Sequence, residues 1–207
     1  MMHLCQTRQI SLLPLLAIIL LLNGCGTTPP SKFYMLESMP ENEAIPASSD
    51  RRNDVHIGIG PIQFADYLGR TQIVTRTDDT EVKLSETHRW AEPLKDNFGR
   101  ILAENLSNLL HTDKISLHPS RNWSEIDYQV LVNVWRFDSS TQGKVTLVAN
   151  WSIRGKGGSH LLTMKKSVFS ANVEPTASYS DIVRTLSETV EMLSHEIAQA
   201  IQIRQGL

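Results

Sequence analysis

The chain has 207 residues, of which 41% are hydrophobic and 20% charged, and its formal net charge is −2. This length allows about one ordinary domain with a single core, and the composition is that of a globular protein rather than a disordered or fibrous one. The absence of excess basic charge argues against a nucleic-acid partner, since nucleic-acid-binding domains are usually clearly basic.

The chain opens with a short start that carries one arginine, followed by an almost unbroken apolar run over residues 10–22. This run is too short to span about 30 Å of hydrocarbon as a helix, but it suits the core of a signal peptide. It ends at Leu22-Asn23-Gly24-Cys25, which resembles the bacterial lipobox, whose cysteine is diacylated and becomes the new N-terminus. We therefore expect residues 1–24 to be a lipoprotein signal peptide and Cys25 to be lipidated. An ordinary secretory signal, cut elsewhere, is the alternative.

Lipidation of Cys25 has consequences for location and charge. Two or three acyl chains, such as palmitate, anchor a protein effectively permanently. Gly26 follows the cysteine in place of the aspartate that resembles an inner-membrane retention signal, so the resemblance implies the periplasmic face of the outer membrane. Loss of residues 1–24 removes Arg8 and no acid, which leaves 19 basic and 22 acidic residues, or −3. Cys5 is lost with the leader, so no disulfide within the mature chain is expected.

The next segment is expected to connect the anchor to a folded domain. Residues 25–32 form the lipidated cysteine and a short tether, and residues 33–207 are expected to be a single periplasmic domain. The eight residues from Cys25 to Phe33 reach at most ~28 Å. A first strand is expected at residues 33–36, and residues 38–54 are expected to form an exposed loop.

The middle of the chain alternates between strand and helix patterns. Residues 55–62 alternate as a strand, whose glycines and Pro61 indicate a bulge or an edge position. Residues 73–76 and 81–85 bracket a polar turn and predict a hairpin. Pro93 suits the first position of a helix, and the apolar stripe that follows runs to about Leu110.

The last third predicts three long strands and a helix. Residues 128–137 are apolar on both faces, which is typical of a central strand, with Phe137 on the same face as Leu131 and Trp135. Strands over residues 145–153 and 161–173 follow. Ser178 and Asp181 resemble a capping box before the last helix. A short strand is also expected at residues 115–117. Together these elements predict an α+β two-layer sandwich, with a mostly antiparallel sheet and both amphipathic helices packed on one face.

Motifs that would carry catalysis are incomplete in this sequence. His195-Glu196-Ile197-Ala198-Gln199 nearly copies the zinc-protease helix, but Gln199 stands where the second histidine is needed. Residues 155–159 have the composition of a phosphate loop without its order and predict a hairpin turn. We therefore expect no catalytic residues, no metal and no cofactor, and we interpret the protein as a non-enzyme. A hydrolase would require converging His, Asp or Ser groups.

The stretch over residues 66–94 concentrates arginine and aromatic side chains. A structural interpretation has the arginines bonding to carbonyls and to Asp66 or Glu92, with Trp90 covering the edge of the core. A functional interpretation is a docking surface, because Arg, Tyr and Trp dominate protein interfaces. The candidate partner-binding residues are Tyr67, Arg70, Arg76, His88, Arg89 and Trp90.

The same stretch carries a resemblance to a known family. Asp66-Tyr67-Leu68 with Arg70, then residues 72–76, and then residues 88–94 (His-Arg-Trp-Ala-Glu-Pro-Leu) resemble the signature of the PqiC (YmbA) family of ABC-type transport auxiliary lipoproteins. The helix over residues 97–106 is also similar, and the resemblance covers essentially the mature chain.

This resemblance implies a non-catalytic docking subunit of an MCE-type, PqiABC-like system for intermembrane lipid transport or membrane integrity. Its partner would be a PqiB-like MCE-domain protein whose tube extends from the inner membrane, and a homo-oligomeric ring of this chain would receive the end of the tube. The alternative is a structural envelope lipoprotein that binds peptidoglycan or assists envelope assembly.

Overall fold

A computed structural model describes residues 29–40, 54–120, 123–156 and 159–205. The predicted signal peptide, Cys25 and the first part of the tether lie outside these ranges and stay predictions, as do part of the turn over residues 155–159 and the end of the last helix. Residues Ser31–Leu207 belong to one unit of the fold. In the described ranges, no helix combines the length and the apolar character needed to cross a membrane.

The described residues contain strands, two α-helices and two short 3-10 helices, η2 and η3. The strands are β1 (Lys32–Tyr34), β2 (Ile57–Phe64), β3 (Gln72–Arg76), β4 (Val82–Trp90), β5 (Ile115–Leu117), β6 (Tyr128–Ser140), β7 (Lys144–Arg154) and β8 (Leu161–Asn172). The helices are η2 (Asp66–Leu68), α2 (Leu94–Leu110), η3 (Trp123–Glu125) and α3 (Tyr179–Gln205). The hairpin, the three-strand meander and both long helices therefore form where the sequence patterns predicted them.

The sheet is mixed, so the prediction of a mostly antiparallel sheet was wrong. The pairs β1–β4, β2–β5, β2–β6 and β3–β6 are parallel, whereas β3–β4, β6–β7 and β7–β8 are antiparallel. The reason is the connection from β2 to β6. It passes through β3, β4, α2 and β5, and parallel strands need a long crossover connection of this kind. Hydrophobic patterning along each strand does not reveal this pairing.

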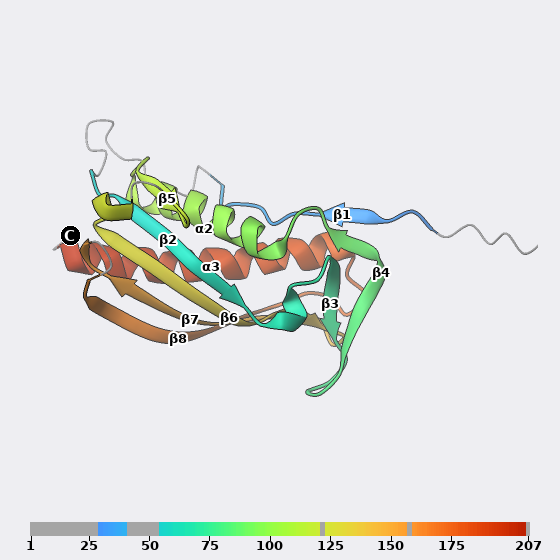
Figure 1. Cartoon of the computed structure of the whole chain (residues 1–207). Coiled ribbons are helices and arrows are strands. Elements are labelled where there is room, and N and C mark those ends of the chain that lie inside the picture. The colour runs from blue at the N-terminus through green and yellow to red at the C-terminus, as the bar shows by residue number, and fades with distance from the viewer. Residues whose placement is uncertain (1–28, 41–53, 121–122, 157–158, 206–207) are drawn as a thin grey trace, which may run out of the picture. The chain divides into compact units, whose positions relative to one another are not determined.

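The arrangement is also not a simple two-layer sandwich. β2 and β3 both pair with β6, where β2 occupies the first part of one β6 edge and β3 the last part. Figure 1 shows that the sheet curls as a result, with β3, β4 and β1 turned up at one end. Helix α2 contacts β2 and β5, α3 contacts β6, β7 and β8, and the two helices contact each other.

A bulge in β6 corrects one detail of the sequence analysis. The β6–β7 register shifts between Val134 and Arg136, and the extra residue changes which side chains face inward. Trp135 is 46% exposed, whereas Phe137 is buried. The Phe137 ring packs edge-on against Phe98, with ring centroids 5.7 Å apart. Phe137 therefore lies on the opposite face from Trp135, whereas the simple alternation had predicted the same face for both.

The segment after β1 is held between the two helices. The exposed loop that was predicted over residues 38–54 therefore starts too early in the sequence. The side chain of Met39 is 4% exposed and that of Leu36 is 3% exposed. The backbone N–H of Leu36 donates to Asn97 Oδ1 at 2.7 Å, and that of Met39 donates to Asn105 Oδ1 at 2.9 Å. These buried asparagines of α2 satisfy backbone donors that have no strand partner.

Both long helices begin with the signals seen in the sequence. α2 starts directly after Pro93, which occupies the N-cap rather than the first helical position, and ends at His111 in the left-handed conformation (φ 51°). At the start of α3, Asp181 N–H donates to Ser178 Oγ at 3.2 Å, and Ser178 N–H donates to Asp181 Oδ2 at 3.3 Å. This reciprocal pair is the predicted capping box.

Candidate docking surface

The six candidate docking residues come from η2, β3, β4 and the turn between η2 and β3. These elements lie together at the end of the sheet that carries β1 (Figure 1). Each of the six side chains has one of three environments: bonded to a buried carboxylate, packed in or against the core, or at least partly exposed to solvent. Contact with a partner is not observed, so their role in docking stays a prediction.

Tyr67 and Arg76 are held by the buried carboxylate of Asp138. The Tyr67 hydroxyl donates to Asp138 Oδ2 at 3.0 Å, and Arg76 Nη2 donates to the same oxygen at 3.2 Å. Arg136 Nε donates to Asp138 Oδ1 at 2.9 Å, and the Asp138 side chain has no exposed surface. A buried charge must be paired and hydrogen-bonded to be tolerated. This network therefore supports the structural interpretation for Tyr67 and Arg76.

The network also fixes the protonation of Tyr67. Burial, and after it the neighbouring Asp138 carboxylate, raises the pKa of the Tyr67 hydroxyl to about 12. A phenol with so high a pKa remains protonated at neutral pH. It therefore acts as a stable donor to Asp138.

Sequence reasoning missed Asp138 and Arg136. It expected Asp66 or Glu92 to bind the arginines, but Glu92 accepts from Arg100 Nη2 at 2.6 Å. Asp138 directly follows the predicted central strand over residues 128–137. An acidic residue at the end of a strand that is apolar on both faces was the available signal, because it must find a cationic partner.

Trp90 and His88 are packed inside the same end of the sheet. Trp90 is 5% exposed and belongs to the core, as the structural interpretation expected, so it has little surface to offer a partner. The His88 ring stacks on Tyr179 with centroids 3.9 Å apart and an interplanar angle of 13°, and its centroid lies 5.7 Å from that of Tyr34. His88 therefore joins β4 to β1 and to the start of α3.

Arg70 and Arg89 are the candidates with accessible charge. Arg70 is exposed in the turn before β3. Arg89 is half-buried in β4, directly opposite Phe33 of β1 on one side and Gln72 of β3 on the other. Within the described residues, the buried Nε of Arg89 has no hydrogen-bond partner. We call Arg89 and the neighbouring Gln72 the Arg89 row, in which a half-buried cation lies beside a half-buried amide.

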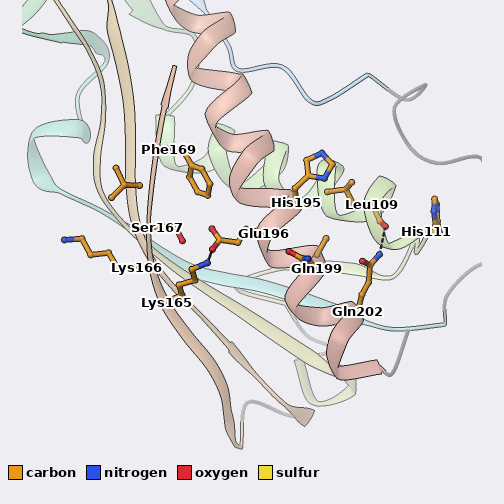
Figure 2. Close-up of a pocket in the computed structure, with 12 residues that line it drawn as sticks. Leu109, His111, Lys165, Lys166, Ser167, Phe169, His195, Glu196, Gln199 and Gln202 are labelled. Carbon is orange, nitrogen blue, oxygen red and sulfur yellow. Dashed lines mark hydrogen bonds and ion pairs between the residues drawn. The ribbon is translucent and has the colours of Figure 1, made fainter. Parts of the chain in front are cut away.

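A separate pocket lies between the edge strand β8 and helix α3. Its volume is about 750 Å³, and Figure 2 shows side chains of β8, α3 and the end of α2 around it. The ammonium group of Lys165 on β8 forms an ion pair with Glu196 on α3. At the other end of the pocket, Gln202 Nε2 donates to the Leu109 carbonyl at 3.4 Å. These contacts connect the sheet edge to the two helices.

Three polar side chains of this pocket have partners within the fold. The Ser167 hydroxyl accepts from the Trp151 indole N–H at 3.0 Å, so it is engaged in the core. His195, from the incomplete zinc motif, lies 3.7 Å from Glu191 of the same helix, whereas Glu196 pairs with Lys165. Across the part of the chain that the structure describes, no three His, Cys, Asp or Glu side chains are grouped so that they could hold a metal ion.

Comparison with solved structures shows a shared fold. The crystal structure of an uncharacterized protein aligns with a TM-score of 0.65 at 20% identity, covering 84% of this chain and 99% of that one. Protein XCC0632 from Xanthomonas campestris aligns with a TM-score of 0.66 at 12% identity, covering 84% and 98%. No curated protein matched the sequence. The model of a family described as "ABC-type transport auxiliary lipoprotein component" matches residues 34–198.

Proposed function

This chain belongs to the family of ABC-type transport auxiliary lipoprotein components, and from that membership we propose that it is a docking subunit of an MCE-type intermembrane lipid transporter. Membership of the family by itself indicates a lipoprotein of the cell envelope with an auxiliary role in transport. The finer proposal adds a PqiB-like MCE-domain partner, a ring of several copies, the periplasmic face of the outer membrane and anchoring through Cys25.

The proposed role is non-catalytic. The family has an auxiliary role in transport, and at the pocket between β8 and α3 Lys165 pairs with Glu196 while Ser167 accepts from Trp151. Docking requires only a rigid surface, a membrane anchor and a partner. The lipobox at Leu22–Cys25 supports the anchor, and the curled end of the sheet supports the rigid surface.

The single observation that carries the docking proposal is the Arg89 row. Arginine is one of the residue types that dominate protein interfaces, and Arg89 keeps part of its side chain exposed beside Gln72. Arg70 adds a second accessible cation at the same end. An acidic or carbonyl-rich edge of the partner could bind these donors.

The test is capture of the PqiB-like partner by purified, acylated protein carrying Arg89→Glu, with Arg70→Glu as a second variant. Arg70 is exposed, so its replacement should leave folding intact. We expect about tenfold or greater loss of affinity for each variant, which corresponds to ~1.4 kcal/mol. Lys156→Glu makes the same charge change at an exposed site beyond the opposite end of β7 and serves as the matched control.

Unimpaired capture by both variants, with thermal unfolding unchanged, would remove the Arg89 row from the interface. If the wild type fails to bind the partner but sediments with purified sacculi, the alternative role as a peptidoglycan-binding envelope lipoprotein is supported instead. Mass spectrometry of the N-terminal peptide tests acylation at Cys25 independently of either result.

A further inference from the structure

Two large apolar side chains project from the segment closest to the proposed anchor. Phe33 is 64% exposed and Met35 is 46% exposed. They alternate with Tyr34 and Leu36, which pack into or against the core. Alternation along an extended segment places Phe33 and Met35 on the side opposite the core. The pair therefore forms an outward-facing apolar ridge.

The ridge is held rigidly by the residues between and after it. Ala91 N–H donates to the Tyr34 carbonyl at 2.9 Å, which fixes β1 against the end of β4. The Leu36 N–H is bound by the buried Asn97. These contacts leave the backbone little freedom to turn Phe33 and Met35 inward. Their exposure is therefore determined by the fold and does not result from a loose terminus.

A cation lies at the start of this ridge, because Lys32 is exposed directly before Phe33. One acidic residue, Glu37, is exposed at the far end of the ridge. Apolar side chains beside an exposed lysine match the layered chemistry of a bilayer surface, where acyl chains lie beneath phosphate groups. Exposed apolar patches of this kind mark sites that another molecule or a membrane covers.

We propose that Phe33 and Met35 insert into the interface of the bilayer that holds the acyl chains of Cys25, while Lys32 binds lipid phosphates. The inference rests on the proposed function only in requiring acylation at Cys25. The length of the tether identifies the occupant, because eight extended residues allow at most ~28 Å between Cys25 and Phe33. A bilayer surface is thus always within reach of the ridge. Insertion would fix the orientation of the domain on the membrane and so determine which way the Arg89 row faces.

The experiment uses the full, acylated protein with one engineered thiol, either Phe33→Cys or Met35→Cys, labelled with an environment-sensitive fluorophore. Cys25 is blocked by its acyl chain and Cys5 is lost with the leader, so the labelled thiol is unique. The protein is reconstituted into vesicles of phosphatidylethanolamine with a minority of phosphatidylglycerol, with or without brominated acyl chains as quenchers. Val168→Cys, on β8, serves as the matched control because Val168 is 61% exposed.

We expect labels at positions 33 and 35 to shift their emission to the blue on vesicle binding and to lose intensity with brominated lipid, while the label at position 168 does neither. A second measurement adds Lys32→Glu to the Met35→Cys variant that carries the label. It should show a smaller blue shift, because the lysine no longer binds phosphate.

Vesicle-bound protein whose labels at positions 33 and 35 respond no more than the label at position 168 would overturn this inference and leave the docking proposal standing. Protein that fails to bind vesicles in every labelled form would overturn anchoring at Cys25 and this inference with it. Quenching at positions 33 and 35 that disappears when the PqiB-like partner is added would show that the ridge contacts protein in the complex, which also contradicts membrane insertion.

Discussion

The hydroxyl of Tyr67 donates a 3.0 Å hydrogen bond to Asp138, although 71 positions separate the two residues in the chain. The bond joins the short helix η2 to the last part of β6, at the point where β2 ends and β3 takes over the same β6 edge. Arg76 and Arg136 complete the shell of the carboxylate. This junction holds the curled end of the sheet on which the Arg89 row lies.

Replacing Tyr67 by phenylalanine should lower the free energy of unfolding by about 1–2 kcal/mol. The change removes a donor to a buried carboxylate, and hydrogen bonds to charged groups contribute about 1.5–3 kcal/mol, while the two arginines remain. Urea denaturation measures the difference. Tyr128→Phe, at a half-buried position on β6, is the control and should change stability by less than about 0.5 kcal/mol. Equal losses in both variants would contradict the assigned role of the Tyr67–Asp138 bond.

The raised pKa of Tyr67 predicts a loss of stability at alkaline pH. The ordinary tyrosine pKa is 10.0 and that of folded Tyr67 is about 12. The unfolded state therefore loses its proton first, so this contribution to stability is complete below pH 10 and declines as the pH rises towards 12. Ultraviolet titration of the wild type should show one tyrosine ionising near pH 12, and this late step should be absent from Tyr67→Phe. A wild type whose tyrosines all ionise near pH 10 would rule out the environment described for Tyr67.

Asn97→Ala should loosen the segment that follows β1. The change leaves the buried N–H of Leu36 without its acceptor, which costs about 1–3 kcal/mol, although it also removes an Asn97 Nδ2 that has no partner among the described residues. The net loss of stability should be about 1 kcal/mol. Hydrogen exchange at the Leu36 amide should become faster than in Asn108→Ala, a substitution on the same helix at a half-buried position. Unchanged protection of Leu36 would show that Asn97 does not hold this segment.

Gly143→Ala should be costly, whereas Gly155→Ala should be tolerated. Gly143 has φ +80° in the turn between β6 and β7, and a Cβ there would lie 2.1 Å from the Val173 carbonyl oxygen. Both the left-handed conformation and the clash oppose a side chain, so a loss of about 2–3 kcal/mol is expected. A Cβ on Gly155 would meet only the Leu162 side chain, at 3.5 Å. Thermal unfolding of the two variants compares these costs, and equal melting temperatures would contradict the turn geometry.

Local patterns predicted a large share of the elements. The stripe of α3, its capping box at Ser178 and Asp181, and the alternation of β7 all appear as expected, because hydrophobic periodicity and capping depend on residues within a few positions of each other. At Pro61 the sequence predicted a bulge or an edge position, and the structure has the bulge, as a register shift in the β2–β6 pair. The sequence also grouped the candidate docking residues in one stretch, but only the structure gives their environments, and their role in docking stays a prediction.

What the sequence determined by itself is the class of elements, their order and the family signature, since each is written in short stretches of the chain. The tertiary structure alone decided that β2 runs parallel to β6, that Asp138 holds Tyr67 and Arg76, and that Trp90 is buried while Phe33 is exposed. These features depend on contacts between residues far apart in the chain. A pairing direction, a salt-bridge partner or an exposed side chain is selected by the free energy of the whole assembled core, and no single segment carries that information.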